Sequence, residues 1–357
     1  LLDVPAGYLA DRHGYLKVLK ITTFIFIITG LCLSFNFNYL TYILSIILST
    51  FGWLFFGPGV SAYTLSHAQE KTSGTFISFK DTFSSIGIVI CTGLLGSLID
   101  SSPQTIGLII TITMSITLIT LFFAPIDKNR PLQVNTSIHH QNHLRRNSFT
   151  KSLKSLKALN PASTMLLLLG LSSSIFYGVL WFILPLVIAH QNNSELLSLS
   201  LGIFDFAVVT LGYFLGRMTD QGNKRTLVFF GLLIFSISAM LLSFNFNWLF
   251  LIFGFLATGG DELASLSLWS WLHSLDKNHQ HDGLISGVIN LSEDFGWTIG
   301  PIAAGVLYSS IGPSLTIALS AGLLFIVWVI YQFFIYKAHP INALINPPKP
   351  PRKRHRG

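Results

Sequence analysis

Long apolar runs, separated by short polar breaks, occupy most of the chain. They lie at about residues 18–37, 40–63, 75–99, 105–124, 162–189, 196–216, 226–243, 248–272, 283–308 and 314–336. Each run is long enough to cross a hydrocarbon layer about 30 Å thick as an α-helix. Residues 1–10 are typical of the end of one more helix, so we expect the sequence to be a fragment of a longer protein. The pattern predicts an all-α polytopic membrane protein.

The composition supports this interpretation. Hydrophobic residues make up 51% of the chain and charged residues only 10%, whereas soluble domains carry about 25% charged residues. A disordered chain would need low hydrophobicity and high charge. The two cysteines, Cys32 and Cys91, both lie inside apolar runs. They predict neither a disulfide framework nor a zinc site.

The basic residues fall on one side of the predicted membrane. The polar breaks alternate between two sides, and one set, taken with the C-terminal tail, holds all 22 Lys and Arg residues. Positively charged loops stay in the cytoplasm, so this set and the tail are predicted to be cytoplasmic, in a plasma membrane or a bacterial inner membrane. The net charge of +7 is thus interpreted as a topology signal. We expect membrane lipid, but no nucleic acid, as a partner.

An internal repeat divides the chain into two similar parts. The segment LSFNFNYL at residues 33–40 recurs as LSFNFNWL at residues 242–249. The same register aligns four glycine pairs and one aspartate pair: Gly7 with Gly216, Asp11 with Asp220, Gly74 with Gly283, Gly87 with Gly296, and Gly96 with Gly305. Parallel halves of six helices around a midplane site are one build of secondary transporters.

The predicted domains follow from this repeat. We expect an N-terminal helix bundle at residues 1–124, from a partial second helix to the sixth, and a cytoplasmic linker at residues 125–160. A C-terminal bundle with helices seven to twelve should occupy residues 161–337. The remainder, residues 338–357, is Pro-rich and then basic, and is expected to be a disordered cytoplasmic tail.

One loop carries a family signature. Residues 7–17, GYLADRHGYLK, resemble the G-x-L-A-D-R-x-G-R-K signature that the major facilitator superfamily carries between its second and third helices. Tyr15 replaces a basic residue of that signature. A degenerate second copy, from Gly216 to Arg225, lies between helices eight and nine. The resemblance implies two pseudo-symmetric six-helix bundles, with helix 1 and most of helix 2 outside this sequence.

The resemblance also implies a cytoplasmic latch between the two halves. Asp11 is expected to accept hydrogen bonds from a neighbouring helix N-terminus, and Arg12 to pair with a carboxylate. Glycines allow helices and a tight turn to approach closely. The latch residues are Gly7, Asp11, Arg12, Gly14, Gly216 and Asp220. An alternative interpretation is a plain solvated turn.

Several acidic residues fall inside predicted spans, where charge is costly and usually functional. At about 1.5 Å per residue, Asp205 lies roughly 14 Å into its helix, Asp261 and Glu262 about 20 Å, and Glu293 and Asp294 about 15 Å. Asp81 lies nearer the cytoplasmic side, beside Lys80. These carboxylates cannot all be ionised without a large penalty. They suit proton coupling or a cationic substrate, or alternatively only form hydrogen bonds to neighbouring helices.

We therefore predict a secondary active transporter that moves a small molecule by alternating access, coupled to protons, with export preferred. It should be a monomer and not an enzyme, with no cofactor and no metal site. Drug antiporters of the superfamily often carry an arginine four residues before a G-x-G, but Trp53 stands there in this chain. The alternatives are a uniporter or metabolite importer of the same fold, a polytopic membrane enzyme, and a receptor that does not transport.

Overall fold

Helices account for the regular structure that the computed structural model describes, which covers residues 3–35, 38–68, 72–98, 103–125, 161–190, 194–244, 248–275 and 282–333. The helices of the first half of the chain are α1 (Asp3–His13), α2 (Tyr15–Phe35), α3 (Tyr39–His67), α4 (Ser73–Leu98) and α5 (Pro103–Phe123). Those of the second half are α7 (Pro161–His190), α8 (Ser194–Gln221), α9 (Lys224–Leu242), α10 (Trp248–Leu275) and α11 (Asp282–Tyr331). The all-α prediction is confirmed. Most of the predicted linker and the whole predicted tail lie outside the described residues.

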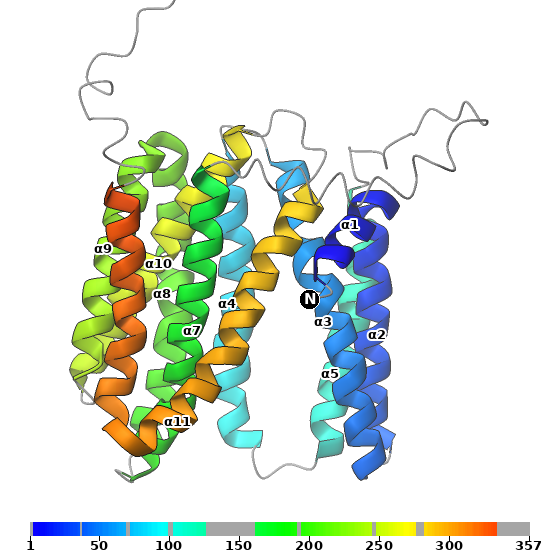
Figure 1. The fold of residues 1–357 in the computed structure, drawn as a ribbon. Helices are drawn as coiled ribbons and strands as arrows, with labels where there is room; N and C mark the ends of the chain where they lie inside the picture. Colours follow the sequence, from blue (N-terminus) through cyan, green and yellow to red (C-terminus); the bar gives the residue numbers. More distant parts are fainter. Residues whose placement is uncertain are drawn as a thin grey trace, which may run out of the picture.

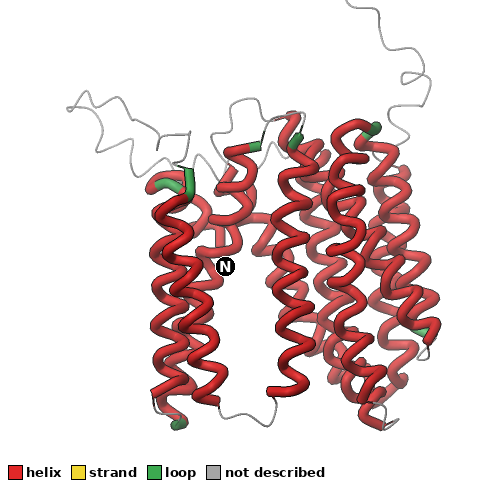
Figure 2. The backbone as a smooth tube through the Cα atoms, turned by 180° about the vertical axis from the view of Figure 1, so that it is seen from behind, coloured by secondary structure: helices red, strands yellow, loops and turns green. Residues whose placement is uncertain are grey.

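The helices stand side by side and form two groups (Figure 1, Figure 2). In one group α1, α2, α3 and α5 lie together, and in the other α7 to α11 lie together. Although α4 belongs to the first half of the sequence, its main packing partner is α8. Helix α1 packs chiefly against α11. The two halves of the chain therefore meet through α4–α8 and α1–α11.

The two ends of this bundle differ in charge. We call the end that carries Arg12, Lys17, Arg217 and Lys224 the basic face. The opposite end, where α2 ends at Phe35 and α9 ends at Leu242, is called the neutral face. Successive helices run between these two faces, as the alternating loop charge requires.

The element α11 consists of two helices that meet at a sharp turn. Two separate spans, 283–308 and 314–336, are expected there, and the chain breaks its helical path at Gly312 (φ 78°, ψ 172°). The second helix then returns to the basic face, where Tyr331 donates a hydrogen bond to the carbonyl oxygen of Arg225 (Figure 1). A positive φ of this size is a conformation that glycine adopts at little cost. Pro313 follows directly, and proline is well suited to the first turn of the helix that leaves the kink.

Seven stretches of the described residues are long and apolar enough to cross a membrane by length and composition, the two helices of α11 counting once. Helices α4 and α8 carry polar and small residues on the faces that meet, including Ser78 and Thr82 of α4.

Candidate functional site

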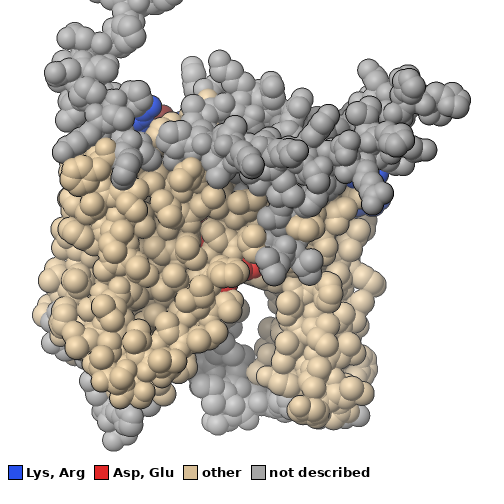
Figure 3. Space-filling view, in the orientation of Figure 1, with Lys and Arg blue, Asp and Glu red and all other residues tan. Residues whose placement is uncertain are grey.

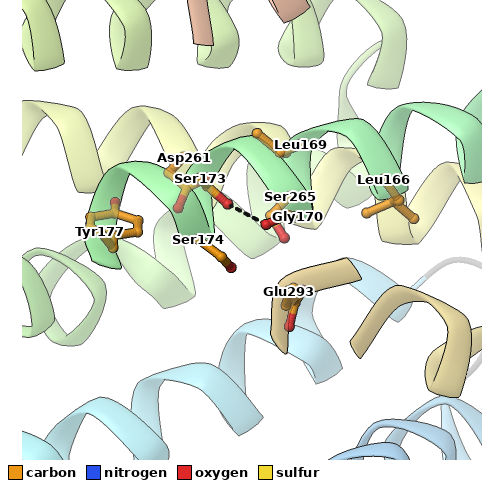
Figure 4. A pocket seen from close by; sticks show the side chains of 9 residues that line it. All are labelled: Leu166, Leu169, Gly170, Ser173, Ser174, Tyr177, Asp261, Ser265 and Glu293. Atoms are coloured by element: carbon orange, nitrogen blue, oxygen red, sulfur yellow. Dashed lines mark hydrogen bonds between the residues drawn. The ribbon is translucent and has the colours of Figure 1, made fainter. Parts of the chain in front are cut away.

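A pocket of about 200 Å³ lies between α7, α10 and α11 (Figure 4). It is lined by Leu166, Leu169, Gly170, Ser173, Ser174 and Tyr177 of α7, by Asp261 and Ser265 of α10, and by Glu293 of α11. Side chains three or four residues apart share one face of a helix. This spacing brings Ser173 and Tyr177 of α7, and likewise Asp261 and Ser265 of α10, to the same cavity.

Close packing of glycines places Glu293 in this pocket. A Cβ atom added to Gly170 would lie 3.1 Å from Cγ of Glu293, so the acidic side chain rests directly on the glycine. One turn further along α11, a Cβ on Gly296 would lie 2.6 Å from the carbonyl oxygen of Leu171. A Cβ on Gly300 would likewise lie 2.8 Å from the carbonyl oxygen of Ile175, on α7. Small residues spaced in this way let two helices touch along their backbones.

An ion pair lies on α4, next to the acidic side chains of α10 and α11. Nζ of Lys80 is 2.9 Å from Oδ1 of Asp81, and these side chains are 27% and 29% exposed. The ammonium group also interacts electrostatically with Glu293 and Glu262. Oε1 of Glu262 is buried and has no hydrogen-bond partner among the described residues. One cation from the first half of the chain thus faces carboxylates of the second half.

The structure separates the acidic residues that sequence position alone treated as equivalent. Asp261 and Glu293 line the same pocket, whereas Glu262 and Asp81 surround Lys80. Asp205 is half-buried on α8, beside Ser85 of α4. Asp294 is exposed. Neither of these last two is among the residues that line the pocket.

Sequence reasoning missed most of the pocket lining. Ser173, Ser174, Tyr177, Gly170 and Ser265 were not predicted as site residues. One signal was present, because three consecutive serines, residues 172–174, interrupt an otherwise apolar run. Their burial in the structure shows that this polar patch faces protein and not lipid.

The molecular surface is hollowed between the two helix groups (Figure 3). Acidic atoms are visible on the inner wall of this hollow. On the basic face, α4, α8 and α10 are held together by hydrogen bonds.

Asp220 is the centre of this contact on the basic face. Its carboxylate accepts hydrogen bonds from the backbone N–H groups of Gly74 (2.8 Å) and Thr75 (2.9 Å). The hydroxyl of Thr75 donates a third, of 2.5 Å. The first N–H groups of a helix lack partners within the helix and favour a negative charge. Asp220, at the end of α8, therefore caps the N-terminus of α4.

Further contacts extend the closure to α10. The hydroxyl groups of Ser73 and Ser270 are 2.8 Å apart, and those of Thr219 and Ser267 are 3.2 Å apart. Gly216 is buried against Ser78 of α4, where no larger side chain fits without movement. The basic face is thus closed between α4, α8 and α10.

The first copy of the predicted latch lies on α1 and at its end. Gly7 is buried and Arg12 is exposed. Gly14 joins α1 to α2 with φ of 91°, a conformation that favours glycine. Asp11 lies within α1, but its side chain lies outside the described residues.

Comparison with known proteins gives one family. The model of the Major Facilitator Superfamily matches residues 1–275 and 166–356. No curated protein sequence matches the chain.

Solved structures with the same fold cover nearly the whole chain. The fucose:proton symporter FucP of E. coli has a TM-score of 0.74 at 14% identity, over 93% of this chain and 87% of FucP. A second FucP structure, described as being in the outward conformation, has a TM-score of 0.72 at 14% identity, over 93% of this chain and 86% of that one. The human organic anion transporter MFSD10 has a TM-score of 0.75 at 14% identity, over 92% of this chain and 80% of MFSD10. At these identities the similarity concerns the fold.

Proposed function

Because the chain belongs to the Major Facilitator Superfamily, and is therefore an integral membrane transporter and not an enzyme, we propose that it carries a small molecule through the pocket between α7, α10 and α11. We propose further that this transport is coupled to protons. FucP, which shares the fold, is described as a proton symporter. The carriers of the proton are proposed to be Asp261 and Glu293.

The observation that supports proton coupling most strongly is the pairing of these two acids in one pocket. They come from different helices, and the lining contains no Lys, Arg or His side chain. Two ionised carboxylates in a site of low dielectric constant repel each other and lack the solvation of water. A proton or another positive group bound at the site removes that cost. A site of this kind changes its protonation when it is exposed to a different solution.

The contacts at the basic face support alternating access. The hydrogen bonds of Asp220 join α8, in the second half of the chain, to α4, in the first half. We propose that residues 1–124 and 161–337 move as two units and that these bonds break when the basic face opens. With the basic face in the cytoplasm, the structure corresponds to a state closed toward the cytoplasm.

Electrical recording after a pH jump tests proton coupling without knowledge of the substrate. Proteoliposomes that contain the full-length protein are adsorbed to a solid-supported membrane, and the outer pH is lowered quickly. We expect a transient inward current, because protons enter the membrane to reach Asp261 and Glu293. The double variant Asp261→Asn, Glu293→Gln should lose most of this current, while Asp294→Asn should keep it.

Two results would contradict the proposal. An unchanged current in the double variant would show that other groups take up the protons. A complete lack of current in monodisperse wild-type protein would exclude this coupling and favour a uniporter or a receptor. Size-exclusion chromatography of each variant separates loss of the site from loss of the fold.

A further inference from the structure

The pocket between α7, α10 and α11 has an unusual balance of donors and acceptors. Both of its ionisable carboxyl groups, on Asp261 and Glu293, are acceptors when ionised. The nearest membrane-embedded cation among the described residues is Lys80, which does not line the pocket and is paired with Asp81 at 2.9 Å. The two carboxylates therefore share a pocket whose lining contains no cation, and the charge of Lys80, which interacts with Glu293 from outside the pocket, is already paired with Asp81.

The hydroxyl groups in the lining add to this imbalance. Ser173 donates its proton to the carbonyl oxygen of Gly170, one turn earlier on the same helix (3.4 Å). Its oxygen lone pairs therefore remain for a ligand. The hydroxyl group of Tyr177 is fully buried beside the carboxylate of Asp261. A single hydroxyl group can satisfy only one of the acceptor positions of that carboxylate, so the others remain for a ligand.

We propose that this pocket binds a small organic ammonium ion that carries N–H groups, such as a primary amine. This inference rests on the proposed transport function and names its class of substrate. The N–H groups would donate to the carboxylates of Asp261 and Glu293 and to the oxygen of Ser173. The charge of the ammonium group would compensate the carboxylates, and charge-assisted hydrogen bonds of this kind are stronger than neutral ones.

Other classes of ligand fit the same lining less well. An organic anion would meet two carboxylates with no cation among the lining residues. A quaternary ammonium ion would supply the charge but no N–H donor. A neutral polyol would supply donors but no charge, so it would need a bound proton to compensate the carboxylates. The volume of about 200 Å³ is also below the roughly 300–1,000 Å³ of sites for drug-sized ligands, so the ligand should be small.

This substrate class determines the mode of coupling. A proton and an ammonium ion would occupy the same two carboxylates, so that each displaces the other. Because the basic face is closed by the contact of Asp220 with α4, protons from the neutral face would release the ammonium ion there. Exchange of the two ions then drives export when the neutral face is extracellular and more acidic.

Equilibrium binding tests this inference independently of transport. The purified full chain in detergent is titrated calorimetrically with ethylammonium, butylammonium, hexylammonium and putrescine at pH 8 and pH 5.5. Tetramethylammonium and L-fucose are the comparison ligands. We expect at least one N–H-bearing ion to bind at least tenfold more tightly than both comparison ligands at pH 8. Its affinity should fall at least threefold at pH 5.5, because protons then compete for the carboxylates.

Variants locate the binding. Asp261→Asn and Glu293→Gln should each lower the affinity at least tenfold, and Tyr177→Phe, which removes only the hydroxyl group beside Asp261, about threefold. Asp294→Asn should bind like the wild type. Equal binding of tetramethylammonium or L-fucose, no binding of any ammonium ion, or full affinity in Asp261→Asn and Glu293→Gln would each overturn the inference. A pH-jump current without ammonium binding would refute this inference alone, whereas ammonium binding without a current would refute proton coupling alone.

Discussion

Asp220 illustrates how one side chain can hold two halves of a transporter together. Its carboxylate accepts from two backbone N–H groups and one hydroxyl group at the start of α4. Hydrogen bonds to a charged group contribute about 1.5–3 kcal/mol, and about 1.4 kcal/mol changes an equilibrium tenfold. The bonds exist only while α4 and α8 are in contact at the basic face.

Replacing Asp220→Asn should therefore open the basic face more often. The amide keeps the shape of the side chain but loses the charge and one acceptor oxygen, so we expect the ratio of open to closed molecules to rise about tenfold. Spin labels at the exposed positions Phe76 of α4 and Arg217 of α8 report the distance between the two helices. Lys17→Gln, another charge change on the basic face, is the control and should leave the distance distribution unchanged. Identical distributions in Asp220→Asn and the wild type would contradict the role of Asp220.

Lys80 allows a second prediction at the scale of single residues. Lys80→Met removes the partner of Asp81 and leaves Glu262 and Glu293 without a nearby cation. Breaking a largely buried pair costs up to about 3–5 kcal/mol, reduced here by partial exposure. We expect the melting temperature in detergent to fall by roughly 5 °C. Lys80→Met combined with Asp81→Asn should recover part of this loss, and no loss in the single variant would show that the pair is not stabilising.

The sequence identified the acidic residues as candidates, but it could not show which of them line the pocket. Depth along a helix follows from the rise per residue, and it selected five acidic residues as candidates, to which Asp81 was added beside Lys80. Which of two adjacent acids faces the pocket depends on how each helix is rotated. That rotation is determined by contacts such as Gly170 with Glu293, which join residues more than 100 positions apart. The serines and Tyr177 of α7 were missed for the same reason.

At the scale of helices, small residues determine which elements meet. Gly212 and Gly216 of α8 lie against Thr82 and Ser78 of α4. Helices α9 and α10 also pack closely at a glycine, because a Cβ on Gly260 would lie 2.6 Å from the backbone nitrogen of Phe235. In lipid, apolar side chains gain little free energy by moving from the hydrocarbon into a contact between helices. Close backbone contact is therefore a main source of helix association.

Two glycines of α8 allow a matched test of this packing. A Cβ at Gly216 would meet the side chain of Ser78 and lie 2.9 Å from the oxygen of Gly74, whereas Gly202 has open space around it. Gly216→Leu should therefore separate α8 from α4 and reduce the yield of monodisperse protein severalfold. Gly202→Leu should behave like the wild type. If both variants gave the same yield and the same elution profile, close α4–α8 packing would not be required.

The helices themselves were largely predictable, because long apolar runs have few alternatives to a membrane-spanning helix. Their boundaries followed from polar breaks such as Asn38, whose side chain caps α3. The break at Gly312, between the two helices of α11, was also predictable, since a glycine followed by a proline indicates a turn. The partnership of α4 with α8, by contrast, was not evident, because it depends on packing between distant segments.

At the scale of the whole molecule, the structure combines a closed basic face with a pocket that contains acidic side chains of two helices. The internal repeat places Asp11 and Asp220 in equivalent positions of the two halves. Two similar halves around a central site can exchange the side on which that site is open. Proton coupling and ammonium binding both depend on this exchange, because the pocket must meet each solution in turn.

Accessibility of the pocket from each face tests this claim most directly. Cys32 and Cys91 are replaced by serine, and Ser174→Cys places one thiol in the pocket lining. Membrane vesicles of both orientations are then treated with a membrane-impermeant maleimide. We predict that position 174 reacts from the neutral face in the parent protein, and that adding Asp220→Asn raises its reaction rate from the basic face severalfold. Reaction from neither face, or from one face at the same rate in both proteins, would contradict alternating access through this pocket.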